Sequence, residues 1–248
     1  MSILNYTEHR PWALPSGSWI LKQNWHELLF AHWPVSPGTI KPLIPDVLNL
    51  DTFEGQAWVG VIPFRMVGVH IRFFPWILRL PTFLELNVRT YVVVEDKPGI
   101  YFFSLEASNL LAVKTARAWF KLPYMKAKMS LRRNRNTVEY SSKRTEQDKP
   151  PAEFVGTYRP TTEVFLSKSG SLEHWFTERY CLYTVDHKNN IYRGEVHHLP
   201  WLLQMAEAEI LKNTVPSSHG INLPDTKPLL HYTHKLEVFT WSPKRLNR

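Results

Sequence analysis

The segment Asn87-Val-Arg-Thr-Tyr-Val-Val-Val-Glu-Asp-Lys-Pro-Gly-Ile-Tyr-Phe-Phe-Ser-Leu105 decides the fold class. Its two ends are rich in β-branched and aromatic residues, which favour strands. Between them, the run 95–99 has turn chemistry, because Pro and Gly preset the backbone for a turn. The segment therefore predicts a β-hairpin, with strands at 87–94 and 100–105.

Further strands are predicted on both sides of this hairpin. Residues 57–62 form a short apolar strand, and 235–241 alternate as a closing strand. A second hairpin is expected from 180–183 and 191–197, around the polar run 186–190. Residues 201–211 fit either a helix or a bent strand, and the polar, proline-bearing stretch 143–156 is predicted to be a loop.

Two short helices complete the prediction. The first runs from Leu110 to about Leu122, with Ser108 or Asn109 as its cap and Pro123 ending it. The alternating residues after Pro123 predict a strand that follows the helix directly. A second helix is expected to begin after Ser171. This pattern predicts a mainly β (α+β) domain spanning 1–248.

Composition narrows the class of protein. The chain has 248 residues, of which 44% are hydrophobic and 21% charged, as in ordinary globular domains. The lone Cys181 cannot form an internal disulfide, and the first residues lack a signal-like apolar core, so a cytoplasmic location is expected. No apolar run is long enough to cross a membrane. The most apolar stretch, 73–78, is expected to cap a pocket or to touch a partner.

A net charge of +8 makes nucleic-acid binding one function to consider. Part of this charge is local, and the favoured interpretation is a solvated hairpin end carrying Lys126, Lys128, Arg132, Arg133 and Arg135. The alternative is nucleic-acid binding through this basic stretch. Because no recognition motif accompanies the stretch, that binding would be weak. Specific nucleic-acid binding is not expected.

Several segments resemble the YqjF-like bacterial proteins, a family grouped with the acetoacetate decarboxylases. They are residues 25–34, 83–91, 122–124, 178–183 and 197–201. The resemblance implies one domain in which a curved antiparallel β-sheet closes into a cone or barrel around a buried pocket. Decarboxylases of this fold are oligomeric, so the resemblance leaves a homo-oligomer open.

The decarboxylase resemblance places the reactive lysines after a proline that follows an arginine by six residues. Arg117 and Pro123 match that spacing, but Tyr124 and Met125 occupy the two lysine positions. Neither side chain can form the Schiff base on which decarboxylation depends. Lys126 lies two residues further on and would keep the strand face of the first lysine. It remains the candidate imine lysine, against the alternative of an exposed strand residue.

A second decarboxylase motif, Tyr-x-Glu, resembles Phe83-Leu-Glu85, so the resemblance makes Glu85 a pocket carboxylate. The other acidic residue of the family would fall near 60–62, and its arginine near Asn24, and neither is present. From spacing alone, Glu85 and Arg89 share one strand face, so an ion pair between them is the alternative.

Metal and cofactor sites are not predicted. Residues His197, His198, His231 and His234 have no familiar ligand spacing, and no phosphate loop, dinucleotide fingerprint or nucleophile elbow occurs. His32 is expected to be a hydrogen-bonded structural residue, and Cys181 a buried inert thiol.

These observations predict a small-molecule-binding protein without a Schiff-base lysine pair, its ligand left open. The residues expected to provide the polar lining of its pocket are Tyr124, Glu85, Arg89 and Arg117. The alternative is an enzyme that acts on a small carbonyl or carboxylate compound. In that case Glu85 is the acid/base, and Lys126 or Arg117 is its partner.

Overall fold

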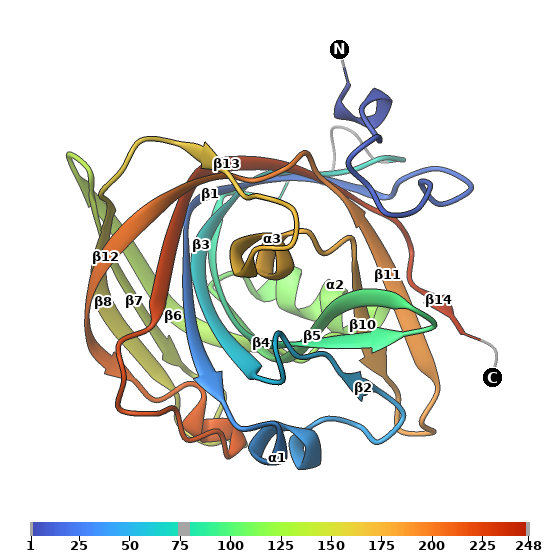
Figure 1. Cartoon of the computed structure of the whole chain (residues 1–248). Helices are drawn as coiled ribbons and strands as arrows, with labels where there is room; N and C mark the ends of the chain where they lie inside the picture. Colours follow the sequence, from blue (N-terminus) through green and yellow to red (C-terminus); the bar gives the residue numbers. More distant parts are fainter. Residues whose placement is uncertain (1, 74–79, 247–248) are drawn as a thin grey trace.

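A long, strongly curved β-sheet forms most of the molecule (Figure 1). The computed structural model describes residues 2–73 and 80–246, so most of the stretch 73–78 lies outside the described residues. The strands are β1 (Leu21–Val35), β2 (Asn49–Leu50), β3 (Ala57–Ile71), β4 (Phe83–Val94), β5 (Lys97–Ala107), β6 (Tyr124–Asn134), β7 (Thr137–Arg144), β8 (Glu153–Pro160), β9 (Phe165–Leu166), β10 (Cys181–Val185), β11 (Ile191–His197), β12 (Leu202–Asn213), β13 (Leu229–Thr240) and β14 (Lys244–Arg245).

The helices are short, as predicted. They are η1 (Ile3–Asn5), α1 (Pro37–Ile40), η2 (Lys41–Leu43), α2 (Leu110–Phe120), α3 (Leu172–Thr177) and η3 (Ser217–His219). The Asn109 side chain caps α2 by accepting a hydrogen bond from the Ala112 N–H at 2.9 Å. Ser171 caps α3 in the same way. No helix of the described chain is both long and apolar enough to cross a membrane.

The sheet closes on itself as a ring. Its strands pair in the order β5-β6-β7-β8-β12-β13-β1-β3-β4, and β4 pairs again with β5. The sheet is mainly antiparallel, as predicted, and it is mixed because β5 runs parallel to β6 and to β10. The physical reason is α2, which carries the chain back between β5 and β6, so that both strands run in one direction.

The decisive hairpin is β4–β5, and its turn is tighter than predicted. Val94 pairs with Lys97, so only Glu95 and Asp96 form the turn, with φ angles of 50° and 57°. Two consecutive positive φ angles are typical of the type I′ turn, whose twist suits a hairpin. Pro98 and Gly99 therefore belong to β5.

Other predictions are confirmed or corrected by the pairing. The hairpin β10–β11 and the closing strand β13 are confirmed. Of the ambiguous residues 201–211, all but Trp201 are strand, within β12. The predicted loop 143–156 was too long, because β7 continues to Arg144 and β8 begins at Glu153. Only part of the basic stretch is at a hairpin end. Arg132, Arg133 and Arg135 lie at the β6–β7 turn, where Arg135 has a φ of 54°, whereas Lys126 and Lys128 lie at the start of β6.

Both faces of the central strands are buried. In β3, Val59 and Val61 pack into one hydrophobic cluster, whereas Ile62 and Phe64 pack into another. This alternation is the ordinary two-residue period of a strand. The second cluster borders the cavity described next, so one face of the ring supports the site and the other supplies a separate core.

Candidate functional site

An apolar cavity of about 300 Å³ lies on the outer face of this ring, where β10 and β11 join β5 to β13 and close a second ring with β1, β3 and β4. Strands β1, β3, β4 and β5 form its walls, and α2 and α3 also contribute side chains. In Figure 1, α2 and α3 are seen between β3 and β11, on the side of the sheet away from β7 and β8. Much of the lining is aromatic or aliphatic, including Trp25, Phe64 and Phe102. Such a cavity with a few polar side chains is typical of small-molecule sites.

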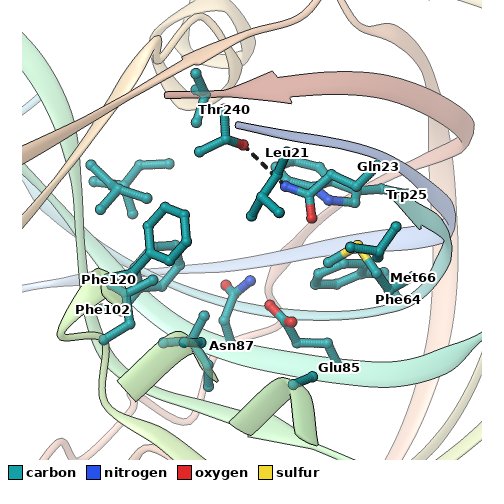
Figure 2. A pocket seen from close by; sticks show the side chains of 18 of the residues that line it. Leu21, Gln23, Trp25, Phe64, Met66, Glu85, Asn87, Phe102, Phe120 and Thr240 are labelled. Atoms are coloured by element: carbon teal, nitrogen blue, oxygen red, sulfur yellow. Dashed lines mark hydrogen bonds between the residues drawn. The ribbon is translucent and has the colours of Figure 1, made fainter. Parts of the chain in front are cut away.

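Strand β4 supplies three polar side chains to the cavity. Glu85, Asn87 and Arg89 are alternate residues, so they share the face that points inward. Figure 2 shows Glu85 and Asn87 pointing into the space opposite Gln23 and Trp25. The prediction that Glu85 and Arg89 share a face is confirmed, but the described residues contain no ion pair between them.

Glu85 and Tyr124 form a buried hydrogen-bonded pair. The Tyr124 hydroxyl donates to Oε2 of Glu85 at 2.9 Å, and Glu85 is 3% exposed. Burial raises the pKa of Glu85 to about 8, although the hydrogen bond from Tyr124 acts in the opposite direction. Burial also raises the pKa of Tyr124 well above its usual value. At neutral pH the pair is therefore mostly uncharged, and Glu85 has a proton that it can donate.

The structure separates Arg117 and Lys126 from the cavity. Both side chains are exposed, and neither lines the cavity. Arg117 Nη2 donates to both carboxylate oxygens of Glu146, at 2.8 and 2.6 Å, and its Nε donates to the Tyr124 carbonyl at 2.6 Å. Lys126 keeps the strand parity of Tyr124, but at this point of β6 that face has reached solvent. At this arginine–proline match, the Arg117 side chain thus holds the start of β6 in place.

Other lining residues were missed by the sequence analysis. Asn87 could have been found, because it lies between Glu85 and Arg89 at strand spacing. Gln23 donates to the Thr240 hydroxyl at 3.3 Å (Figure 2) and was missed because no strand was predicted at 21–35. Arg179 and His198 also line the cavity. Their positions depend on how β10 and β11 pack against β5 and β13, which local sequence does not encode.

The surroundings of Cys181 and His32 indicate structural roles for both residues. Cys181 lines the cavity, and burial raises the pKa of its thiol to about 12, as expected for an unreactive cysteine. His32 is fully buried, with Nε2 at 2.6 Å from the Tyr91 hydroxyl and its ring stacked on Phe176. Within residues 2–73 and 80–246, no three His, Cys, Asp or Glu side chains gather as metal ligands would.

Comparison with known proteins gives a family match and a fold match. The model of the DUF2071 family, described as an uncharacterized conserved protein, matches residues 22–237. The chain is 48% identical over 229 residues to the uncharacterized protein YqjF of Bacillus subtilis (strain 168), covering 92% of this chain and 93% of that protein.

Solved structures extend the likeness to the fold. An acetoacetate decarboxylase from Legionella pneumophila has a TM-score of 0.64 at 10% identity, covering 100% of this chain and 96% of that chain. The enduracididine biosynthesis enzyme MppR, complexed with a condensation product of pyruvate and imidazole 4-carboxaldehyde, has a TM-score of 0.62 at 8% identity, covering 92% and 90%. An acetoacetate decarboxylase-like enzyme from Sphingomonas wittichii RW1 has a TM-score of 0.62 at 12% identity, covering 96% and 98%. At these identities the likeness establishes the acetoacetate decarboxylase-like fold alone.

Proposed function

This chain belongs to the DUF2071 family of uncharacterized conserved proteins, and from that premise we propose that it binds a small, largely apolar molecule in the cavity described above. The observation that carries the proposal is the apolar cavity of about 300 Å³ with the Glu85–Tyr124 pair on its wall. An engineered apolar cavity of about 150 Å³ holds benzene, so this cavity has room for a larger body. A protonated Glu85 would donate a hydrogen bond to a carbonyl or hydroxyl oxygen of the ligand.

Structures of the same fold support a ligand of this size. MppR has been solved with pyruvate and with the condensation product named above, both of which are small molecules. Its low identity transfers no residue role to this chain. The support for ligand binding here therefore comes from the cavity itself, from Glu85 and Tyr124, and from Arg89 on the same strand as Glu85.

The test uses an uncharged fluorescent probe, N-phenyl-1-naphthylamine, whose emission rises in apolar surroundings. We expect saturable binding to the wild-type protein and at least a tenfold loss in Ala116→Phe, because Ala116 lines the cavity and the added ring would fill it. Ala118→Phe is the matched control, since Ala118 is exposed on the same helix and does not line the cavity. Equal probe binding by both variants would contradict the proposal.

The second candidate function is an enzyme in which Glu85 is the acid/base. The observation that favours it is the raised pKa of Glu85, about 8, because a group that titrates near neutral pH can both donate and accept a proton. Schiff-base decarboxylation is disfavoured, since no lysine of the described chain lines the cavity.

A trapping experiment separates these functions. After borohydride reduction with a panel of keto acids, mass spectrometry should find no site-specific adduct and assays should find no acetoacetate decarboxylation. One adduct at Lys126, lost in Lys126→Ala, would overturn this expectation. Turnover without an adduct, abolished in Glu85→Gln, would favour the acid/base enzyme.

Location and assembly complete the proposal. The single, buried Cys181 supports a cytoplasmic location. With one cysteine the chain cannot form an internal disulfide, and disulfides are rare in reducing compartments. Cell fractionation tests this location. Light scattering coupled to gel filtration tests the homo-oligomer that the decarboxylase-like fold suggests.

A further inference from the structure

Arg89 is a buried cation that faces the cavity without a counter-charge. It is 5% exposed and lines the cavity, and within the described part of the chain no carboxylate lies within ion-pairing distance of it. Its Nη2 donates to the Tyr91 hydroxyl at 3.3 Å, but its Nε has no hydrogen-bond partner. The rings of Phe30 and Tyr91 lie 5.4 and 5.6 Å from its guanidinium carbon and offset only part of the cost of burial.

The groups around Arg89 do not neutralise it. Arg179 also lines the cavity, but its charge is matched by Asp51 at 2.5 Å. Burial and the charge of Arg89 lower the pKa of His32 well below its usual value. Burial lowers the pKa of His198 to about 4. Both histidines are therefore neutral at pH 7, and this end of the cavity has one positive charge in excess.

An unpaired buried charge is costly, whereas a buried charge with a hydrogen-bonded counter-ion is tolerated. The planar guanidinium is suited to a carboxylate, which can accept two parallel hydrogen bonds from it. One excess positive charge also matches a monoanion better than a dianion, which would leave a buried negative charge. A ligand that supplies one carboxylate would therefore complete the site.

We infer that the ligand is an apolar monocarboxylate whose carboxylate binds Arg89, an inference that rests on the proposed function of the cavity. Glu85 lies four residues before Arg89 on β4, which corresponds to about 13 Å along an extended strand. A neutral oxygen of the ligand near Glu85 would accept a hydrogen bond from the protonated carboxyl. The apolar walls between these two residues would contact the hydrocarbon body.

The test is competition against N-phenyl-1-naphthylamine by two matched compounds, 4-phenylbutyrate and 4-phenylbutanamide. With the wild-type protein, the carboxylate should displace the probe at a concentration at least tenfold lower than the amide. Arg89→Met should weaken displacement by the carboxylate roughly 10- to 100-fold, the range expected for hydrogen bonds to a charged group. Displacement by the amide should not change. Arg132→Met, an exposed arginine on β6, is the control and should behave as wild type.

Each outcome decides the inference. Equal displacement by both compounds in the wild-type protein would overturn it while leaving the proposed function intact, since the probe still binds. Absence of probe binding would overturn both proposals. If Arg89→Met does not fold, Arg89→Lys keeps the charge but loses the planar fork, and an unchanged preference for the carboxylate there would contradict a paired, two-bond contact.

Discussion

Arg89 and Arg144 are both buried, yet only Arg144 has a carboxylate partner. Nε and Nη2 of Arg144 donate to the two oxygens of Glu106 at 3.2 and 2.6 Å, and both side chains are 1% exposed. Nη1 of Arg144 donates to the carbonyl of Pro150. Arg89 has one long hydrogen bond to a tyrosine hydroxyl. The difference follows the two faces of the sheet, because Glu106 comes directly after Leu105, which lines the cavity, and so faces away from it.

The comparison separates what stabilises the fold from what serves a ligand. For Arg144, which belongs to the core, the fold supplies a counter-ion within the chain. For Arg89, which faces the cavity, the counter-ion is missing, and the carboxyl on the same strand, Glu85, is mostly protonated at neutral pH. The two arginines should therefore respond in opposite ways when their surroundings are changed.

The largest effect is expected from breaking the paired site. Glu106→Leu leaves Arg144 charged and unpaired in the core, so the free energy of unfolding should fall by about 3–5 kcal/mol. Urea denaturation at pH 7 measures it. Adding Arg144→Met to that variant should recover most of the loss, because no charge is then stranded.

The same measurement on Arg89→Met sharpens the comparison. Removing an unpaired buried charge in the absence of ligand should leave the free energy of unfolding unchanged or raise it by about 1 kcal/mol. A loss as large as that of Glu106→Leu would mean that Arg89 is a structural residue and would contradict the ligand assignment.

A pH-dependent effect is expected from Glu85, at the neutral end of the cavity. The folded pKa of Glu85, about 8, lies above its ordinary value of 4.5, so the unfolded chain loses this proton first. Stability from this group is complete below pH 4.5 and is lost as pH rises to about 8, by a few kcal/mol in all. Glu85→Gln cannot ionise and should match wild type near pH 5 but exceed it in stability near pH 8.5.

The groups around Glu85 support a loss of stability with rising pH. Tyr124 from β6 and Tyr140 from β7 have pKa values raised well above their usual range by burial, so both stay neutral throughout. Arg89 on β4 stays charged. Denaturation curves for the two proteins between pH 5 and pH 9 give the difference directly, and a constant difference over that range would contradict the raised pKa.

Sequence reasoning reached the fold class and part of the site for identifiable reasons. The β4–β5 hairpin, the capped α2 and the shared face of Glu85 and Arg89 depend on local patterns, which sequence records. The parallel pairing of β5 with β6, and with it the exposure of Lys126, depends on where α2 packs. At the arginine–proline match, Arg117 binds Glu146 and the Tyr124 carbonyl outside the cavity, which the spacing alone could not reveal.

The smallest pH shift is expected from the hydrogen bond that holds the Glu85 carboxyl. The Tyr124 hydroxyl donates to the carboxyl and lowers its pKa, so Tyr124→Phe should move the pH midpoint of the stability loss upward by less than about one unit. The lost hydrogen bond should also cost about 0.5–1.5 kcal/mol near neutral pH. Tyr140→Phe is the matched control, because the Tyr140 hydroxyl donates at 2.8 Å to the main-chain carbonyl of Glu85 and not to its carboxyl. That control should lower stability without moving the midpoint. Of these two hydroxyls, that of Tyr124 contacts the titrating carboxyl and that of Tyr140 does not, so a midpoint that moves equally in both variants would contradict this assignment.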